Sequence, residues 1–279
     1  MSELLSIGYG LASAASWGSG DFSGGIASKR NHVYNVVIFS QIIGMVFLFI
    51  LAVLFLEPIP SSTNLLWGGI AGLAGALGLL ALYKGLSTGQ MSIIAPLSAI
   101  IAVTIPLVVS IIVEGPPAVL QFFGFGFALL AVWFISQSNN QIQLGLVEFK
   151  LILLAGLGFG FFFIFINQIQ ENFVFWPLIV ARIFSISLLV GISIFAKQFK
   201  VPDAKNLPVI ALAGIFDVGG NAFFVLAAQT GRLDIAAVLS SLYPAATVIL
   251  AWLLLKERLS RVQFLGIVCA IVAIILITM

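Results

Sequence analysis

The stretch NLLWGGIAGLAGALGLLALYKGLSTG, residues 64–89, returns in altered form as NLPVIALAGIFDVGGNAFFVLAAQTG, residues 206–231. Both copies are apolar, begin with Asn-Leu and end with Thr-Gly. Sliding the whole chain on itself, without a gap, until the two Asn-Leu pairs coincide aligns further identical residues, beginning with Gly18 and Gly160. We call this superposition the repeat alignment. An internal repeat that runs along the chain predicts two structural units of like architecture.

The composition indicates the solvent in which these units fold. Hydrophobic residues make up 61% of the chain and charged residues 8%, whereas roughly a quarter of the residues of a soluble domain are charged. So few charges cannot cover the chain for water, and we expect lipid to be its main solvent. The net charge of +2 gives no reason to expect a nucleic-acid partner.

Histidine and cysteine chemistry is nearly absent from the sequence. The single cysteine, Cys269, lies in the last apolar run, and the single histidine, His32, lies in a polar connector. These two residues leave no intrachain disulfide, no Cys-based or His-based metal site and no Ser/His catalytic pair within the membrane. We therefore expect no metal and no cofactor.

Ten segments are apolar and long enough to cross a bilayer, which takes about 20 residues at 1.5 Å per residue. Their connectors are short and rich in turn residues. Because the runs are continuous rather than alternating, a closed β-barrel is excluded. The predicted fold class is an all-α polytopic membrane protein with ten transmembrane helices, at about residues 4–26, 33–56, 64–84, 92–113, 118–136, 146–167, 175–196, 207–227, 235–255 and 262–278.

The repeat divides these helices into two halves of five, residues 1–137 and 143–279. Because five is odd, the second half must cross the membrane in the opposite sense to the first. The charges of matched connectors support this inversion. Basic SKRNH at 28–32 aligns with QENFV at 170–174, which has no Lys or Arg. The fold is thus predicted to be two inverted-topology repeats.

Almost all Lys and Arg residues of the connectors fall on one side of this topology, and only Arg232 clearly falls on the other. The positive-inside rule places the basic side in the cytoplasm and both termini outside. We expect a multi-pass protein of the inner (cytoplasmic) membrane.

Residues 214–277 resemble the second repeat of an EamA-type transporter of the drug/metabolite transporter superfamily. The resemblance is carried by Ala227 before a polar turn, VLSSLYP at 238–244, KERLS at 256–260 and the spacing of Gln263 and Gly266. SWGSGDFSGGIASKR, residues 16–30, is similar to the first helix of many such proteins. The first half matches more loosely, because Ala102 stands where the second half has Pro244 and VEGPP replaces KERLS.

The resemblance implies a secondary transporter with a cavity between the halves, lined mainly by helices 1, 3, 4, 6, 8 and 9. The sequence holds no Gly-x-x-x-x-Gly-Lys-Ser/Thr motif, so we expect transport to be driven by a gradient rather than by ATP. We predict that the protein is not an enzyme and moves a small organic metabolite or drug-like solute outward by alternating access, as a monomer in the lipid bilayer. The expected partners are the solute and a proton or another coupling ion.

Two alternatives remain open at this point. One is an importer or facilitator of a cationic nutrient of the choline type. The other is an intramembrane aspartyl protease, because GSGDF at 18–22 resembles the Gly-x-Gly-Asp motif that carries one catalytic aspartate, and Asp217 could supply the second. Against the protease, the order of the two aspartates is reversed and the Pro-Ala-Leu element of those enzymes is missing.

Ionisable residues deep in the predicted helices are candidates for function. Such a group costs at least about 2.5–3.5 kcal/mol to insert, so it is expected to be paired or functional. Arg182 is expected to pair with either Asp21 or Asp217 as a structural lock. The spare acid would bind a proton or hold a cationic substrate. Asp21 is also close enough to Lys29 to lie in a wet vestibule.

Helical spacing places other candidates beside the two aspartates. Asp21 shares a face with Trp17, and Asp217 shares a face with Asn221 and Phe224. Aromatic side chains could form a cage for flat rings or quaternary ammonium groups, although membrane aromatics often face lipid instead. The aromatic candidates are Trp17, Tyr83, Phe163, Trp176, Phe224 and Tyr243.

Pro244 cannot donate a hydrogen bond to the carbonyl of Ser240, so the ninth helix is predicted to kink beside Ser240 and Ser241. The kink serves either a binding site or packing. Asp234, at the start of this helix, is expected to be its N-cap.

Overall fold

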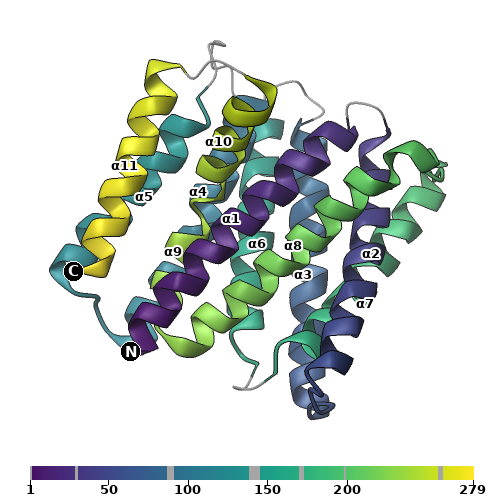
Figure 1. The fold of residues 1–279 in the computed structure, drawn as a ribbon, viewed down its shortest axis with the longest axis horizontal. Helices are drawn as coiled ribbons and strands as arrows, with labels where there is room; N and C mark the ends of the chain where they lie inside the picture. The colour runs from purple at the N-terminus through teal and green to yellow at the C-terminus, as the bar shows by residue number, and fades with distance from the viewer. Residues whose placement is uncertain are drawn as a thin grey trace.

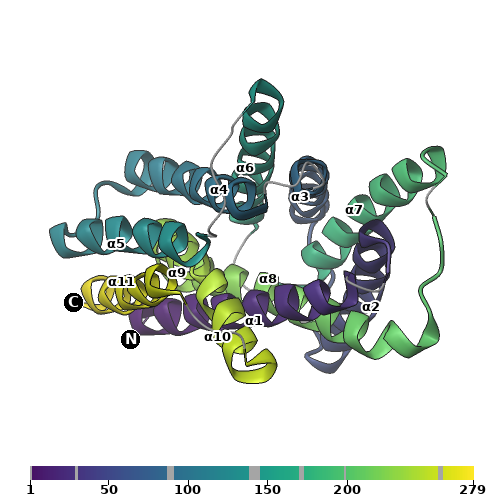
Figure 2. The same cartoon turned by 90° about the horizontal axis from the view of Figure 1, so that it is seen from above.

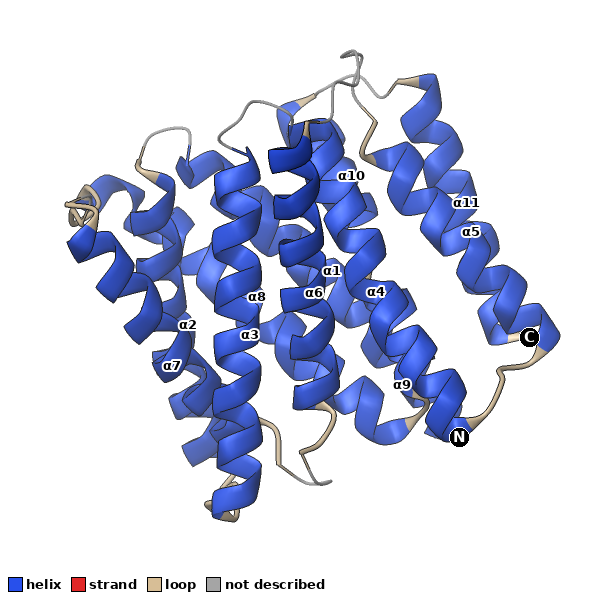
Figure 3. Cartoon of the chain, turned by 180° about the vertical axis from the view of Figure 1, so that it is seen from behind, coloured by secondary structure: helices blue, strands red, loops and turns tan. Residues whose placement is uncertain are grey.

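In a computed structural model, the chain is described over residues 2–28, 31–86, 91–137, 145–169, 173–197, 199–256 and 260–279, and the described part is helical with no strand (Figure 3). The helices are α1 Ser2–Ser28, α2 Val33–Leu54, α3 Ser62–Leu86, α4 Met91–Glu114, α5 Val119–Ile135, α6 Leu146–Ile166, α7 Phe175–Phe195, α8 Leu207–Thr230, α9 Leu233–Ser240, α10 Tyr243–Leu255 and α11 Arg261–Thr278, with a 3-10 turn, η1, at Ala204–Asn206.

The predicted membrane spans agree with these helices, with one correction. In the described part of the chain, eight segments are long and apolar enough to cross a bilayer, and α5 is a shorter apolar helix. α1 is long enough, but its serines, glycines and Asp21 make it less apolar than the others. The predicted span 235–255 is broken into α9 and α10, so the ten predicted segments correspond to eleven helices along the described residues.

The two repeats are interleaved rather than side by side. α1 packs against α8 and α10, and in the same way α6 packs against α3 and α4. Seen from above, α2 lies beside α7 at one end of the molecule and α5 beside α11 at the other (Figure 2). Each pairing has its counterpart after the repeats are exchanged, as two inverted-topology five-helix repeats require. The exact boundaries at residues 137 and 143 stay a prediction.

Both termini lie at the same end of the bundle, which we call the terminal face (Figure 1). Successive helices alternate in direction, so the opposite end carries the basic connectors, and we call it the lysine face. Its described basic residues are Lys84, Lys150, Lys197, Lys200, Lys205, Lys256 and Arg261. Which of the two faces meets the cytoplasm stays a prediction.

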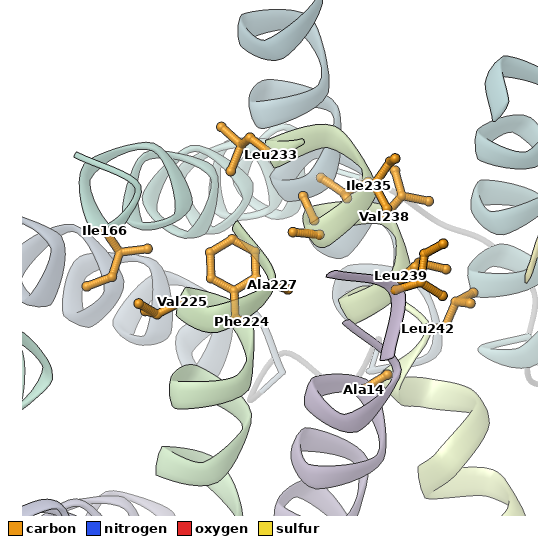
Figure 4. Packing of buried hydrophobic residues seen from close by; sticks show 14 of the residues in the cluster. Ala14, Ile166, Phe224, Val225, Ala227, Leu233, Ile235, Val238, Leu239 and Leu242 are labelled. Atoms are coloured by element: carbon orange, nitrogen blue, oxygen red, sulfur yellow. The ribbon is translucent and has the colours of Figure 1, made fainter. Parts of the chain in front are cut away.

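The break before Pro244 separates a buried half-helix from an open one. All eight residues of α9, on the terminal side, are buried, whereas α10, on the lysine side, has no buried residue. Around α9, apolar side chains from several helices form the terminal plug, which includes Ala14, Phe224, Leu239 and Leu242 (Figure 4). Around the break, the packing is therefore dense on the side of α9 and looser on the side of α10.

Close approach of α1 to α10 depends on Gly18. A Cβ atom at this position would lie 2.5 Å from the Ala246 Cβ and 2.6 Å from the Tyr243 carbonyl oxygen. In the other repeat, a Cβ atom on Gly160 would lie 3.1 Å from the Ala102 carbonyl oxygen. Small residues that let helix backbones approach are the usual contacts of membrane helices. The glycines of GSGDF are thus explained by packing.

This explanation makes a prediction about stability. Gly18→Ala should lower the free energy of unfolding by about 1–3 kcal/mol, because the added methyl group overlaps α10. Gly8→Ala in the same helix is the matched control, because a Cβ atom there meets nothing within 4 Å. Thermal unfolding of the two variants in detergent checks the prediction, and equal midpoints would show that the approach at Gly18 is not tight.

Candidate functional site

One ion pair of the described residues lies near the middle of two long helices and joins α7 to α8. Arg182 Nη2 lies 2.5 Å from Asp217 Oδ2, and the side chain of Arg182 is 13% exposed while that of Asp217 is 42% exposed. The pairing expected for Arg182 is present, and Asp217 is the aspartate that takes it. The guanidinium compensates this carboxylate, so Asp217 is not the spare acid.

Asp21 is placed beside this pair by the crossing of α1 over α8. A Cβ atom on the neighbouring Gly20 would lie 3.2 Å from the Asp217 backbone nitrogen. The carboxylates of Asp21 and Asp217 repel each other electrostatically, and the Asp21 carboxylate also interacts electrostatically with Tyr243. Asp21 itself is exposed.

Among the described residues, no cation lies within ion-pair distance of Asp21. Lys29, the neighbour considered from the sequence, lies outside the described residues. Among the described charged groups of the site, Asp21 is therefore the one without an oppositely charged partner.

Four of the six aromatic candidates come together one turn away from Asp21. Trp17 has its ring centroid 5.9 Å from that of Phe163, 6.1 Å from that of Phe224 and 6.4 Å from that of Tyr243. Phe163 and Phe224 are 4.6 Å apart. We call these four residues the aromatic cluster. Because they come from α1, α6, α8 and α10, the cluster joins both repeats at the depth of the helix break.

One aromatic candidate, Trp176, is not part of this cluster. Trp176 lies at the terminal face, where its Nε1 donates to the Glu57 carbonyl oxygen over 2.9 Å. The Glu57 carboxylate also accepts from the Phe175 and Trp176 backbone N–H groups, which caps α7. The side chain of Tyr83 lies outside the described residues. Trp176 is therefore a structural anchor in this fold.

Of the polar candidates near the cluster, Asn221 and Ser241 bond to the backbone of their own helix and Ser240 bonds to the backbone of α1. Asn221 is buried and its Nδ2 donates to the Asp217 carbonyl oxygen over 2.7 Å. Ser241 Oγ donates to the Val238 carbonyl oxygen, and Ser240 Oγ lies 3.5 Å from the Gly10 carbonyl oxygen. α9 ends at Ser240 and α10 begins at Tyr243, as the predicted kink requires.

Sequence reasoning missed the polar seam that fixes α1 against α8. Ser13 Oγ donates to the Gly220 carbonyl oxygen over 2.8 Å, and Ser16 Oγ donates to the Phe216 carbonyl oxygen over 2.7 Å. Nearer the terminal face, Ser6 Oγ donates to the Ala227 carbonyl oxygen. The signal was available, because serines at positions 6, 13 and 16 share one helical face. These bonds set the position of Trp17 and Asp21.

The charged residues of the site have no charged counterparts at the positions that the repeat alignment pairs with them. In the repeat alignment, Asp21 corresponds to Phe163, Arg182 to Ser40, and Asp217 to Gly75. The place equivalent to the ion pair is therefore uncharged. Exchange of the repeats does not generate a second charged site.

The geometry offers little to the protease alternative. Two aspartates that share one proton are the signature of that catalysis, whereas Asp217 is engaged by Arg182. In the part of the chain that the structure describes, no group of three or more His, Cys, Asp or Glu side chains could hold a metal ion.

Comparison with known proteins agrees with this architecture. The model of the EamA-like transporter family matches residues 4–137 and again residues 148–279. The chain belongs to the EamA-like transporter family. It is therefore a multi-pass integral membrane protein and a transporter of the drug/metabolite transporter superfamily.

Two relatives of this EamA-like protein illustrate the repeat and the fold. The uncharacterized protein MJ1333.1 of Methanocaldococcus jannaschii is 32% identical over 126 residues, which are 45% of this chain and 92% of that protein. A protein of about one repeat in length is thus similar to part of this EamA-like chain. A solved crystal structure superposes with a TM-score of 0.80 over 99% of this chain and 96% of its own, at 10% identity, which speaks for the fold alone.

The ion pair can be tested by a double-mutant cycle. Arg182→Gln and Asp217→Asn should each lower the free energy of unfolding by about 1–3 kcal/mol, because each leaves a charged partner without compensation. The double variant should lose less than the sum, with a coupling energy of about 0.5–3 kcal/mol. Unfolding in detergent measures all four proteins, and additive effects would show that the pair contributes no net interaction.

Proposed function

We propose that this EamA-like protein is a secondary transporter that moves a small organic solute out of the cytoplasm by alternating access, driven by a gradient. The observation that carries the proposal is the Asp21 carboxylate, which is exposed, uncompensated by any described cation, and one helical turn from the aromatic cluster. A charge without a partner inside a membrane protein is a binding site by default.

The charge balance favours a positively charged ligand. Asp21, Asp217 and Arg182 together carry one excess negative charge when both carboxylates are ionised. A proton or an organic cation neutralises it. The faces of the Trp17 and Tyr243 rings suit the apolar body of such a solute by stacking and by cation–π attraction. Solute and proton would then compete for Asp21, which couples their movements in opposite directions.

The packing supports loading from the lysine face. The terminal plug and the buried α9 separate Asp21 from the terminal face, whereas α10 leaves the lysine side less densely packed. If the lysine face meets the cytoplasm, as the positive-inside rule implies, the solute reaches Asp21 from the cytoplasm. That access is the one an exporter needs, and we place the protein in the cytoplasmic membrane with both termini outside. Because both repeats come from one chain, a monomer suffices.

The excess carboxylate also favours a second candidate, an importer or facilitator of a cationic nutrient. This candidate uses the same site and differs in the direction of net flux. Uptake of a radiolabelled quaternary ammonium compound by right-side-out and inverted vesicles distinguishes the two. Accumulation in inverted vesicles, driven by an imposed proton gradient, identifies the exporter. Entry into right-side-out vesicles down the compound's own concentration gradient, with no proton gradient, identifies the facilitator.

A binding screen tests the role of Asp21. Purified protein is heated with cationic, zwitterionic, aromatic and neutral metabolites, and a ligand at a hundredfold excess over Kd should stabilise the folded state by about 2.7 kcal/mol. We expect organic cations to stabilise the wild type and to lose this effect in Asp21→Asn. Glu148→Gln is the matched control, because Glu148 is a carboxylate at the lysine-face end of α6.

Two outcomes would overturn the assignment. Stabilisation by cations that survives Asp21→Asn would place the binding charge elsewhere. Stabilisation only by neutral compounds would remove the cation from the proposal and leave Asp21 a proton-binding group.

Asp217→Asn is expected to abolish or uncouple transport while the protein stays folded, and wild-type rates in that variant would refute a role for Asp217.

A further inference from the structure

A second charged group lies far from the site, at the terminal face. Arg232, between α8 and α9, donates through Nε to Asp234 Oδ1 over 3.1 Å and through Nη2 to Asp234 Oδ2 over 2.7 Å. The same Nη2 donates to the Gly115 carbonyl oxygen over 2.7 Å, and Nε lies 3.9 Å from Glu114 Oε2. Arg232 thus joins the start of α9, in the second repeat, to the end of α4, in the first.

Asp234 was expected to cap α9, but it is the second residue of the helix. The N-cap is Arg232, and Asp234 instead accepts from the Ile235 backbone N–H over 2.8 Å. The Asp234 side chain has no exposed surface, so its charge depends on Arg232. The hydrogen bond to Asp234 raises the pKa of Arg232 above its ordinary value.

We infer that Arg232, with Glu114 and Asp234, forms a latch that holds the terminal face of the transporter closed. The latch sits directly over the terminal plug, because α9 begins at Leu233 and all its residues are buried. Opening a path from Asp21 to the terminal face requires α4 and α9 to part. That movement breaks the bond from Arg232 to the Gly115 carbonyl and removes Glu114 from the guanidinium.

Contacts elsewhere in the molecule indicate that the opening movement occurs between α4 and α9 rather than at the α2–α7 end. At the α2–α7 end, Glu57 ties the repeats together at the terminal face, and Asn35 Oδ1 accepts from the Lys200 backbone N–H over 3.1 Å at the lysine face. That end is held at both faces. The cross-repeat ties of α4 and α9 at the terminal face are therefore the ones whose release opens the plug.

The residues of the latch have no equivalents at the repeat-aligned positions, so the latch can act at the terminal face and not at the lysine face. In the repeat alignment, Glu114 corresponds to Lys256, Arg232 to Gln90 and Asp234 to Ser92. A lysine, an amide and a hydroxyl cannot form an equivalent ion pair when the lysine face closes. The latch therefore stabilises only the state that is closed at the terminal face, and it biases the resting transporter toward loading from the lysine face. This inference rests on the proposed alternating access, but not on the identity of the solute.

Cysteine accessibility tests the latch without any substrate. Cys269→Ser removes the one native thiol, and Ser240→Cys places a reporter at the end of α9, where Ser240 has no exposed surface. Ile59→Cys, at a connector residue that is 72% exposed, reports which vesicle orientation presents the terminal face to a membrane-impermeant maleimide. From that face, we expect the Ser240→Cys reporter to be labelled several-fold faster in Glu114→Gln or Arg232→Gln than in the latched protein.

Controls separate an opened latch from a damaged fold. Lys205→Gln removes one charge at the lysine face and should leave labelling unchanged. If Arg232→Gln alone fails to fold, because Asp234 is left buried and unpaired, Arg232→Gln with Asp234→Asn removes both charges together. Unchanged labelling in Glu114→Gln and in this double variant, with both proteins folded, would overturn the latch. A failed solute screen with increased labelling would refute only the proposed substrate chemistry.

Discussion

The seam between α1 and α8 is the contact on which the site depends. Ser6, Ser13 and Ser16 each donate to a carbonyl oxygen of α8, and Gly20 lets the two backbones approach beside Asp217. In lipid, helices gain little from hydrophobic contact with one another, so small residues and interhelical hydrogen bonds decide which faces meet. A sliding of α1 along α8 by one turn would move Asp21 and Trp17 together away from their partners.

Much of the architecture could be predicted from the sequence because its causes are local or periodic. Continuous apolar runs predicted the helices, the repeat alignment predicted the two inverted halves, and Pro244 predicted the break before α10. The site could be predicted only by residue type. Arg182 could reach either aspartate by depth alone, and only the arrangement in which α2 packs against both α7 and α8 selects Asp217.

Contacts between distant segments explain what sequence reasoning missed. Trp176 has the composition of a cage residue, but Glu57, which lies 119 positions earlier in the chain, binds its ring nitrogen and the start of its helix. Asp234 has the position of a cap, but its carboxylate accepts from Arg232, which also donates to the Gly115 carbonyl oxygen of the first repeat. Both residues serve links between repeats, which no property of a single helix reveals.

The break at Ser241 and Leu242 separates α10 from the buried half-helix α9. Both residues are buried, so this non-helical backbone is shielded from lipid and can act as a fixed fulcrum. α10 has 13 residues, and at 1.5 Å per residue its length is about 20 Å, so a tilt of about 10° moves its far end by about 3 Å. A small rotation about this break would therefore move the lysine-face end of α10 while the packing of α9 stays intact.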